Sequence, residues 1–316
     1  MNKKFAVVLM NLGGPDSLEA VQPFLQNLFS DPDIFKIPLV QKPMAKLIAK
    51  KRAPKVIEEY KLIGGKSPIG YWTEIQRKML EEKLNADENL FDVFVAMRYW
   101  KPFTHEVVEK VSKNNYEKIF LLPLYPQYSI STTGSSFNEW KRHYRNNQTE
   151  VIFIENYHTN ENYIKSVIER IEQSLNEFLD KTNVYLLFSA HGVPVSYIKK
   201  GDPYQKQIEE TVQLVITHGK FTNPYSLAYQ SKVGPMKWLE PSTEKEIERL
   251  IHSGFKNLLV IPIAFVSDHI ETLYELDIEY RKIAEECGAE KYLVMKGLND
   301  SQTFIEALKE EIWKRL

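Results

Sequence analysis

A histidine at the end of an apolar strand is the first residue in this sequence that could do chemistry. The stretch LLFSAHGVPVSYIKKGDPY (186–204) opens as a buried strand, turns polar, reaches His191 and is then broken by glycine and proline. An imidazole can accept a proton or bind a metal near neutral pH. Alone, a histidine beside a strand is more often a structural group, so His191 needs support from a second feature.

Acidic side chains at helical spacing provide that second feature. The stretch FVSDHIETLYELDIEY (265–280) follows another apolar run and is typical of a helix. Asp268, Glu271 and Glu275 are spaced i, i+3, i+7, which predicts one shared helix face, with His269 beside them. Carboxylates on one face repel each other unless a cation or shared protons relieve them. A neutral imidazole and a carboxylate are competent for proton abstraction and for transient metal binding.

A structural interpretation of the acidic stretch is also open. Asp268 could be the N-cap of the helix, with Glu271 as its capping-box partner three residues later. That interpretation accounts for neither Glu275 nor His269.

Two polar loops have some of the features of nucleotide-binding loops. NLGGPDS (11–17) lacks the third glycine of a dinucleotide fingerprint, and LPLYPQYSISTTGSS (122–136) has one glycine and no GK[ST]. Both absences disfavour nucleotide binding. Aromatic residues such as Tyr125 and Trp238 suggest a large flat apolar ligand, although core packing would also explain them.

A basic stretch and an apolar stretch lie near the N-terminus. QKPMAKLIAKKRAPK (41–55) carries five lysines and Arg52 without an acid, which indicates a solvated face, a guide for ligand carboxylates or a surface for anionic lipid. Residues 24–37 contain Phe24, Phe29, Phe35 and Ile37, which predicts an apolar lip at a membrane surface or ordinary core.

Bulk composition is that of an ordinary globular protein. The 316 residues are 43% hydrophobic and 26% charged, and the net charge of -1 gives no basic field for nucleic acid. The single cysteine, Cys287, excludes an intramolecular disulfide and an all-cysteine metal site. We expect no signal peptide, because only about eight apolar residues follow the first lysines, and no membrane span.

Short apolar runs alternate with amphipathic segments, which predicts parallel sheets covered by helices on both faces. The expected strands are residues 5–12, 91–99, 118–126, 150–157, 184–191, 226–233 and 257–265, with a short one at 292–298. FAVVLMNLGGP resembles VYLLFSAHGVP, and IFLLPLYP resembles LLVIPIAF, so we expect two similar α/β lobes. The first lobe would hold residues 1–149 and 292–316, and the second 150–291. Ligands of such sheets bind beyond the strands' carboxyl ends, here in a cleft between the lobes, where the two reactive stretches would face each other.

Six motifs, in order along the chain, resemble those of the ferrochelatase family. They are MNLGGPDS, EEYKLIGGKSPI, YPQYSISTTGSS, LLFSAHGVPVSYIKKGDPY, SKVGPMKWL and PIAFVSDHIETLYELDIEY, and the resemblance runs from about residue 5 to the end. It implies two Rossmann-like lobes, each a parallel four-stranded sheet flanked by helices, with a porphyrin cleft between them. It also implies a lyase that inserts Fe(II) into protoporphyrin IX, the last step of haem synthesis.

The resemblance assigns roles to matching positions. His191 is the expected proton acceptor or metal-side ligand, and Glu271 its acidic counterpart across the macrocycle. Asp268, His269 and Glu275 match an acidic path for metal delivery or proton removal. The positions that match the porphyrin pocket are Leu12, Arg52, Tyr60, Arg98, Tyr125, Ser131 and Trp238.

Two departures from the family's patterns refine these expectations. Animal-type members bind an iron–sulfur cluster through a cysteine-bearing C-terminal tail, whereas this sequence ends at Leu316 and has Ile130 at the upstream cluster position. We therefore expect no cluster and no tightly bound cofactor, with Fe(II) acting as substrate. Coproporphyrin-using members usually have a tyrosine in the first loop, where this chain has Leu12, which favours protoporphyrin.

The sequence is also compatible with other functions. They are a coproporphyrin III ferrochelatase, a non-catalytic bilobal protein that binds haem or metal, a cobalt chelatase of corrinoid synthesis, and a nucleotide-dependent transferase. The expected location is the cytoplasm, either free or in peripheral contact with the inner membrane, as a monomer or homodimer and without nucleic acid.

Overall fold

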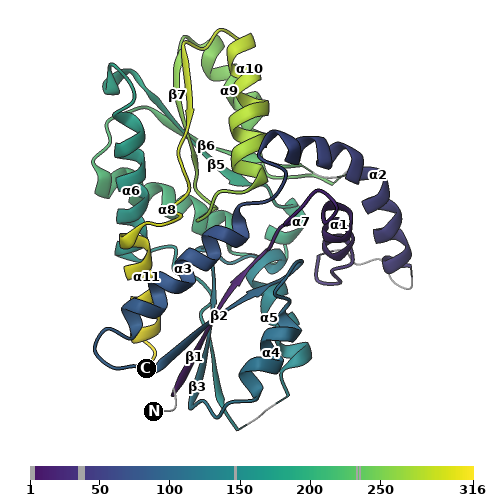
Figure 1. The fold of residues 1–316 in the computed structure, drawn as a ribbon. Coiled ribbons are helices and arrows are strands. Elements are labelled where there is room, and N and C mark those ends of the chain that lie inside the picture. The colour runs from purple at the N-terminus through teal and green to yellow at the C-terminus, as the bar shows by residue number, and fades with distance from the viewer. Residues whose placement is uncertain (1–3, 35–39, 146–147, 233, 235) are drawn as a thin grey trace. The chain divides into compact units, whose positions relative to one another are not determined.

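The chain forms two compact units, each built on its own parallel sheet (Figure 1). A computed structural model describes residues 4–34, 40–145, 148–232, 234 and 236–316. The first unit comprises Met1–Tyr157 and Ile305–Leu316, and the second comprises His158–Phe304. Within the described ranges, no helix combines the length and apolarity that crossing a bilayer needs.

The sheet of the first unit has the strand order β2-β1-β3-β4. Its strands are β1 (Phe5–Asn11), β2 (Phe91–Met97), β3 (Lys118–Pro123) and β4 (Glu150–Phe153). Helices α4 (Thr104–Ser112) and α5 (Ser135–His143) pack on one face through Val107, Val111 and Trp140. Helices α3 (Ile69–Leu84) and α11 (Gln302–Trp313) lie on the other face (Figure 1) and are joined by the Lys83–Glu306 ion pair. Coverage on both faces explains why β1 is apolar along its length.

Two further helices of the first unit follow β1. Helix α1 (Val21–Phe29) buries Phe24 and Phe29, and helix α2 (Gln41–Leu62) packs beside it. The guanidinium of Arg52 on α2 lies over the ring of Phe29, 5.5 Å from its centroid. The aromatic residues in 24–29 therefore belong to the core of this helix pair.

The sheet of the second unit has the equivalent order β6-β5-β7-β8. Its strands are β5 (Tyr185–His191), β6 (Tyr225–Gln230), β7 (Asn257–Pro262) and β8 (Lys291–Val294). Helices α9 (Thr243–His252) and α10 (Tyr280–Glu286) pack on one face. Helices α6 (Glu161–Leu175) and α8 (Tyr204–Gly219) lie on the other side of this sheet, and α7 (Val195–Ile198) is a short connecting helix (Figure 1).

The equal strand orders confirm the expected pair of similar α/β lobes, but the chain divides between them at other residues. Strand β4, expected to open the second lobe, pairs with β3 in the first sheet. Strand β8, expected to return to the first lobe, pairs with β7 in the second. In both units the fourth strand is added beside the third after a helical crossover, as consecutive parallel strands usually are. Only the end of the chain from Ile305, in α11, belongs to the first unit.

Each unit also contains a π-helix after its third strand. Residues Ile130–Gly134 precede α5, and Glu271–Glu279 precede α10. The sequence led us to expect α-helical spacing over the second segment. π-Helices are rare and occur often at functional sites.

Candidate functional site

His191 and Glu271 form a hydrogen-bonded pair within the second unit. His191 is the last residue of β5, and Glu271 opens the π-helix that follows β7. Because β5 and β7 are neighbouring parallel strands, their carboxyl ends meet at one edge of the sheet. The His191 Nδ1 atom lies 3.0 Å from Glu271 Oε2. The expectation that the two stretches face each other across a cleft was wrong, because both belong to one sheet, and the direct hydrogen bond leaves no room for a macrocycle between His191 and Glu271.

The partners of both histidines fix their proton positions. An ionised carboxylate can only accept, so His191 Nδ1–H donates to Glu271, and the lone pair of the neutral ring is on Nε2. His269 Nδ1 lies 3.1 Å from the Ser267 carbonyl oxygen and must likewise carry the proton. His269 Nε2 is 3.7 Å from Glu271 Oε2, so this carboxylate lies between two imidazoles. The ring of Phe265 packs against His269 at 4.5 Å between centroids.

Burial and mutual attraction shift the pKa values of His191 and Glu271. Burial disfavours the charged form of Glu271, but attraction to His191 and the hydrogen bond from His191 outweigh this effect and hold the pKa of Glu271 well below its usual range. Burial also disfavours the imidazolium of His191, yet the Glu271 charge outweighs that effect and raises the pKa of His191. An ionised carboxylate therefore supports an imidazole that is more basic than an isolated one, which suits a proton acceptor.

The GDPY segment after His191 holds the backbone of that histidine. Asp202 Oδ1 accepts a hydrogen bond from Tyr204 N (3.0 Å) at the start of α8. Gly201 supplies the positive φ of 90° that the turn requires. The Tyr204 hydroxyl then donates to the His191 carbonyl oxygen (3.0 Å). This role of Tyr204 was not predicted from the sequence, where the GDPY segment after His191 was the available signal.

Gly192 and Trp238 pack together beside His191. A Cβ atom on Gly192 would lie 2.9 Å from the Gln230 carbonyl oxygen and 3.3 Å from the Trp238 ring. Only glycine therefore fits between β6 and the indole without a shift. Trp238 also bridges to Pro194. Its Nε1–H is buried without a partner among the described residues.

Asp268 is a structural group in this fold. Its Oδ1 accepts from Thr272 Oγ1 and Gly297 N, both at 3.1 Å, and its Oδ2 accepts from Asn299 Nδ2 at 2.6 Å. The backbone N–H of Asp268 donates to Asn299 Oδ1, so Glu271 does not close a capping box and that interpretation was wrong. Asp268 joins the start of the helix to the segment after β8.

The five residues expected to bind metal thus divide into three environments. His191, His269 and Glu271 lie together, Asp268 is enclosed by its hydrogen bonds, and Glu275 contacts Ser231 and Tyr280. Within the described parts of the chain, no three His, Cys, Asp or Glu side chains are arranged to hold a metal ion. The His191–Glu271 pair with its neighbour His269 is the part of the prediction that the structure brings together.

Arg98, expected in the porphyrin pocket, belongs to a buried ionic network of the first unit. Its guanidinium lies 3.0 Å from Asp31 and 3.6 Å from Glu139, and it donates to Ser135 Oγ at 2.8 Å. The same Asp31 carboxylate accepts 2.5 Å hydrogen bonds from Tyr99 and Ser135. With 9% of its side chain exposed, Arg98 anchors the segment after α1.

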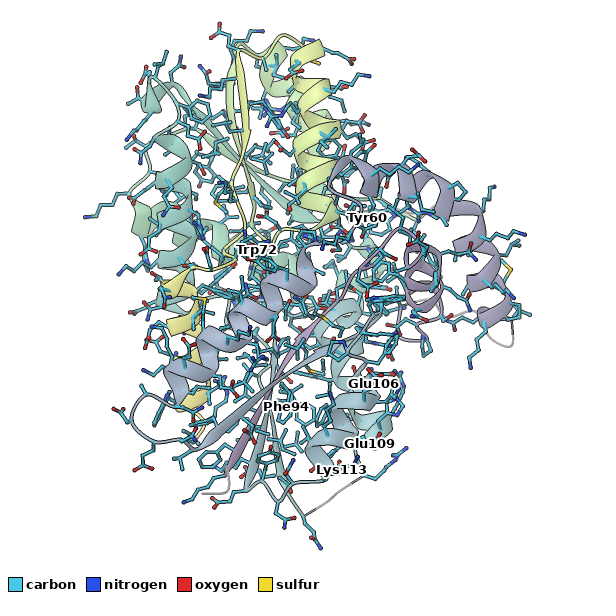
Figure 2. All side chains as sticks on the ribbon, viewed as in Figure 1. Tyr60, Trp72, Phe94, Glu106, Glu109 and Lys113 are labelled. Carbon is cyan, nitrogen blue, oxygen red and sulfur yellow. The ribbon has the colours of Figure 1, made fainter. Side chains whose placement is uncertain are left out.

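The remaining expected pocket residues of the first unit lie near the ends of its strands or on α2. Leu12 follows β1 and is half-buried, and its carbonyl accepts from Tyr99 N (2.9 Å). Burial raises the pKa of Tyr125, which lies two residues after β3. Ser131 is in the first π-helix, with its hydroxyl 3.1 Å from that of Ser129. Tyr60, in the last turn of α2 (Figure 2), is 2% exposed.

The exposed apolar side chains of this region differ from those expected. Phe24 and Phe29 are core residues, and Phe35 and Ile37 lie outside the described residues. Instead, Leu47 is 62% exposed on α2, with Val40 and Met44 exposed at helical spacing before it.

Comparison with known proteins places the whole chain in one family. A family model described as Ferrochelatase matches residues 4–316. The chain is 49% identical to a ferrochelatase of Sulfurihydrogenibium sp., with 99% of this chain and 98% of the relative covered. It is also 49% identical to a ferrochelatase of Aquifex aeolicus, with 97% and 98% covered.

Solved structures that share the fold are more distant in sequence. CbiX, described as the terminal enzyme for biosynthesis of siroheme in denitrifying bacteria, superposes with a TM-score of 0.54 at 10% identity, covering 99% of this chain and all of its own. SirB from Bacillus subtilis gives a TM-score of 0.54 at 10% identity, covering 98% and 95%. These similarities confirm the expected chelatase-like fold.

Proposed function

Because the chain belongs to the ferrochelatase family, we propose that it inserts Fe(II) into protoporphyrin IX, the terminal step of haem biosynthesis. Family membership itself assigns an enzyme that inserts iron into a porphyrin. The choice of protoporphyrin, the pathway step and the formation of protohaem with release of two protons are the proposal. The reaction is a lyase reaction in which iron is substrate.

The observation that carries the mechanism is the His191–Glu271 hydrogen bond. A free-base porphyrin carries two pyrrole N–H protons, and both must leave as the metal enters. His191 presents Nε2 as the acceptor for one proton at a time and passes the first to water before it takes the second, while Glu271 holds the Nδ1 proton and stabilises the imidazolium that forms. His191 is 36% exposed, so a substrate can reach the ring.

The same residues can help to remove water from Fe(II). Imidazole and carboxylate are ligands that iron accepts, and a pair of them binds weakly enough to release the metal to the porphyrin nitrogens. We assign this role to His191 and Glu271, with His269 beside the carboxylate. The resemblance places Asp268 and Glu275 on the metal path. Their carboxylates already accept hydrogen bonds from neighbouring residues, so we propose that they stabilise the fold around the site.

No tightly bound cofactor and no iron–sulfur cluster are part of the proposal. The only thiol of the chain, Cys287, caps α10 and lies after the π-helix. A cluster is held by several cysteines, but the sequence has no second cysteine, and position 130 is isoleucine.

For protoporphyrin over coproporphyrin, the support is Leu12. Its apolar side chain stands where coproporphyrin-using relatives usually carry tyrosine. A hydroxyl there would suit a substrate with additional carboxylates, whereas leucine suits the vinyl groups of protoporphyrin.

We further propose that the protein works in the cytoplasm and touches the inner membrane peripherally through α2. Val40, Met44 and Leu47 form an exposed apolar stripe, and the exposed Lys46 and Lys50 flank it. An apolar stripe with flanking lysines is typical of a helix that binds an anionic lipid surface. The net charge of -1 argues against nucleic acid as partner, and the protein would act as a monomer or homodimer.

The deciding experiment is anaerobic incubation of the purified protein with Fe(II) and either protoporphyrin IX or coproporphyrin III, followed by metalloporphyrin absorbance. The His191→Ala protein is the control. We expect rapid turnover of protoporphyrin that is lost in the control. Preference for coproporphyrin would overturn the substrate proposal, and porphyrin binding without metal insertion would favour a non-catalytic carrier.

A further inference from the structure

Every acceptor position of the Glu275 carboxylate is already occupied. Oε1 accepts from Ser231 N and from the Tyr280 hydroxyl, both at 2.9 Å. Oε2 accepts from Ser231 Oγ at 2.5 Å and from Gln230 Nε2 at 3.4 Å. A carboxylate offers about four lone-pair sites, so these four donors saturate it. Binding a metal would require Glu275 to release them.

Two of these hydrogen bonds hold Ser231 in an unusual backbone conformation. Ser231 has φ of +64°, in the left-handed region that residues other than glycine rarely adopt. A side chain at such a position costs free energy, and surrounding contacts must offset it. Here Glu275 binds both the backbone N–H and the hydroxyl of Ser231, so one carboxylate fixes this turn from two sides.

The turn at Ser231 lies directly beside the catalytic strand. Gln230 is the register partner of His191, and its carbonyl accepts from Gly192 N at 2.8 Å. The Gln230 side chain is buried, with 1% exposed, and its Oε1 accepts a hydrogen bond from Ser189 Oγ on β5 at 2.8 Å. The Gln230 carbonyl and the Trp238 ring flank Gly192, the residue after His191. Glu275 therefore connects the π-helix to the segment that flanks His191.

From this arrangement we propose that Glu275 is a positioning residue rather than a metal ligand. It locks Gln230 and Ser231, and thereby the Gln230 carbonyl that packs together with the Trp238 ring around Gly192, the residue after His191. The inference deepens the proposed function, since the placement of Trp238 matters for how a porphyrin is held.

Three variants separate positioning from a role of the negative charge. In Glu275→Gln the amide oxygen can still accept from Ser231 N, and the amide NH2 can donate to the Ser231 hydroxyl, which reverses its direction, so we expect activity within about threefold of wild type. In Glu275→Ala all acceptors are lost, and we expect KM for the porphyrin to rise about tenfold while KM for Fe(II) stays unchanged. Adding Ser231→Gly to Glu275→Ala should restore most of the loss, because glycine adopts positive φ without support.

Tyr280→Phe is the matched control. It removes one donor to the same carboxylate but leaves both bonds to Ser231, so we expect wild-type kinetics. A Glu275→Gln variant as impaired as Glu275→Ala, with a raised KM for Fe(II) and no rescue by Ser231→Gly, would overturn the inference and assign Glu275 to the metal.

A readout without turnover keeps the inference separate from the proposed function. In protein labelled with 5-fluorotryptophan, the Trp238 fluorine resonance, assigned with Trp238→Phe, should shift in Glu275→Ala and return in the double variant. If the wild type inserts no iron but this pattern holds, the proposed function fails and the positioning role stands. If iron insertion is normal but the resonance does not move in Glu275→Ala, the positioning role fails.

Discussion

At the scale of single residues, the proposed chemistry depends on one imidazole, His191, whose two nitrogens have different roles. Glu271 occupies Nδ1 of His191, and Nε2 is the nitrogen that can accept a proton. Replacing His191 with alanine should lower kcat by at least about a hundredfold, the usual contribution of a proton acceptor. Because the ring is 36% exposed, little packing is lost, and the melting temperature should stay close to wild type. Near-normal turnover would remove His191 from the mechanism.

The pair also predicts a pH dependence. The carboxylate of Glu271 outweighs burial and raises the pKa of His191, so the neutral base is regained only above that raised value. In Glu271→Gln the attraction is lost while burial remains, and the pKa of His191 should fall. The rising limb of kcat/KM against pH should therefore move to lower pH, with a lower maximum.

A titration by NMR tests this shift without turnover. The ring nitrogens of His191 report its protonation directly in both proteins. If their midpoint is the same in wild type and Glu271→Gln, the carboxylate does not set the basicity of the imidazole.

Asp268 leads to a prediction about stability. In Asp268→Asn, one buried oxygen becomes an NH2 group that faces donors from Thr272 and Gly297 or from Asn299. An unsatisfied buried polar group costs about 1–3 kcal/mol. The free energy of unfolding in urea should fall by this amount. Glu279→Gln, at an exposed position of the π-helix, should change it by less than about 0.5 kcal/mol. Equal stabilities of the two variants would contradict the structural role of Asp268.

Some functional residues could be predicted from the sequence, and others could not, because their roles depend on contacts with distant residues. His191 was found because it ends an apolar strand, and Glu271 was found because acidic side chains recur at helical spacing in 268–275. Ser231 could not be found, because its positive φ is imposed by Glu275, which is 44 positions away in the sequence. Asp268 was placed on the wrong face because the i, i+3, i+7 rule assumes an α-helix that starts before it.

At the scale of elements, strands were predictable and the π-helix was not. The buried strands are continuous apolar runs, and all eight expected runs form strands of the two sheets. The π-helix Glu271–Glu279 differs from an α-helix only in its hydrogen-bond spacing, and no residue propensity encodes that difference. The lobe boundary was misjudged because apolar runs do not reveal which neighbour each strand will pair with.

Helix α2 is the element whose exposed face makes a testable prediction. Leu47→Glu places a charge in the middle of the stripe of Val40, Met44 and Leu47. We expect it to reduce cosedimentation with vesicles that contain anionic lipid by about fivefold or more, since both apolar burial and electrostatic attraction contribute. Lys206→Glu, on the exposed face of α8, is a control for charge alone and should bind as wild type does. Unchanged binding of Leu47→Glu would remove α2 as the contact.

At the scale of the whole molecule, two units of one topology carry different chemistry at equivalent places. Aligning FAVVLMNLGGP with VYLLFSAHGVP puts Leu12 of the first unit at the position of His191 in the second, each followed by glycine. Both residues come at the end of the strand second in its sheet order. The two units thus share one strand arrangement. In the second unit, this position carries an imidazole, which is hydrogen-bonded to a carboxylate, whereas in the first unit it carries leucine.

We therefore expect the side chain at position 12 to influence which porphyrin the protein accepts. Its backbone is fixed by the 2.9 Å hydrogen bond from Tyr99 N to its carbonyl, so a substitution should change the side chain without moving the strand end. In Leu12→Tyr, a hydroxyl replaces apolar surface and can hydrogen-bond to a substrate carboxylate. We expect the ratio of kcat/KM for coproporphyrin III to that for protoporphyrin IX to rise by about tenfold, as one added hydrogen bond can provide. Leu12→Met, which keeps an apolar side chain of similar size, should leave the ratio unchanged. If tyrosine and methionine give the same ratio, Leu12 does not discriminate between the two porphyrins.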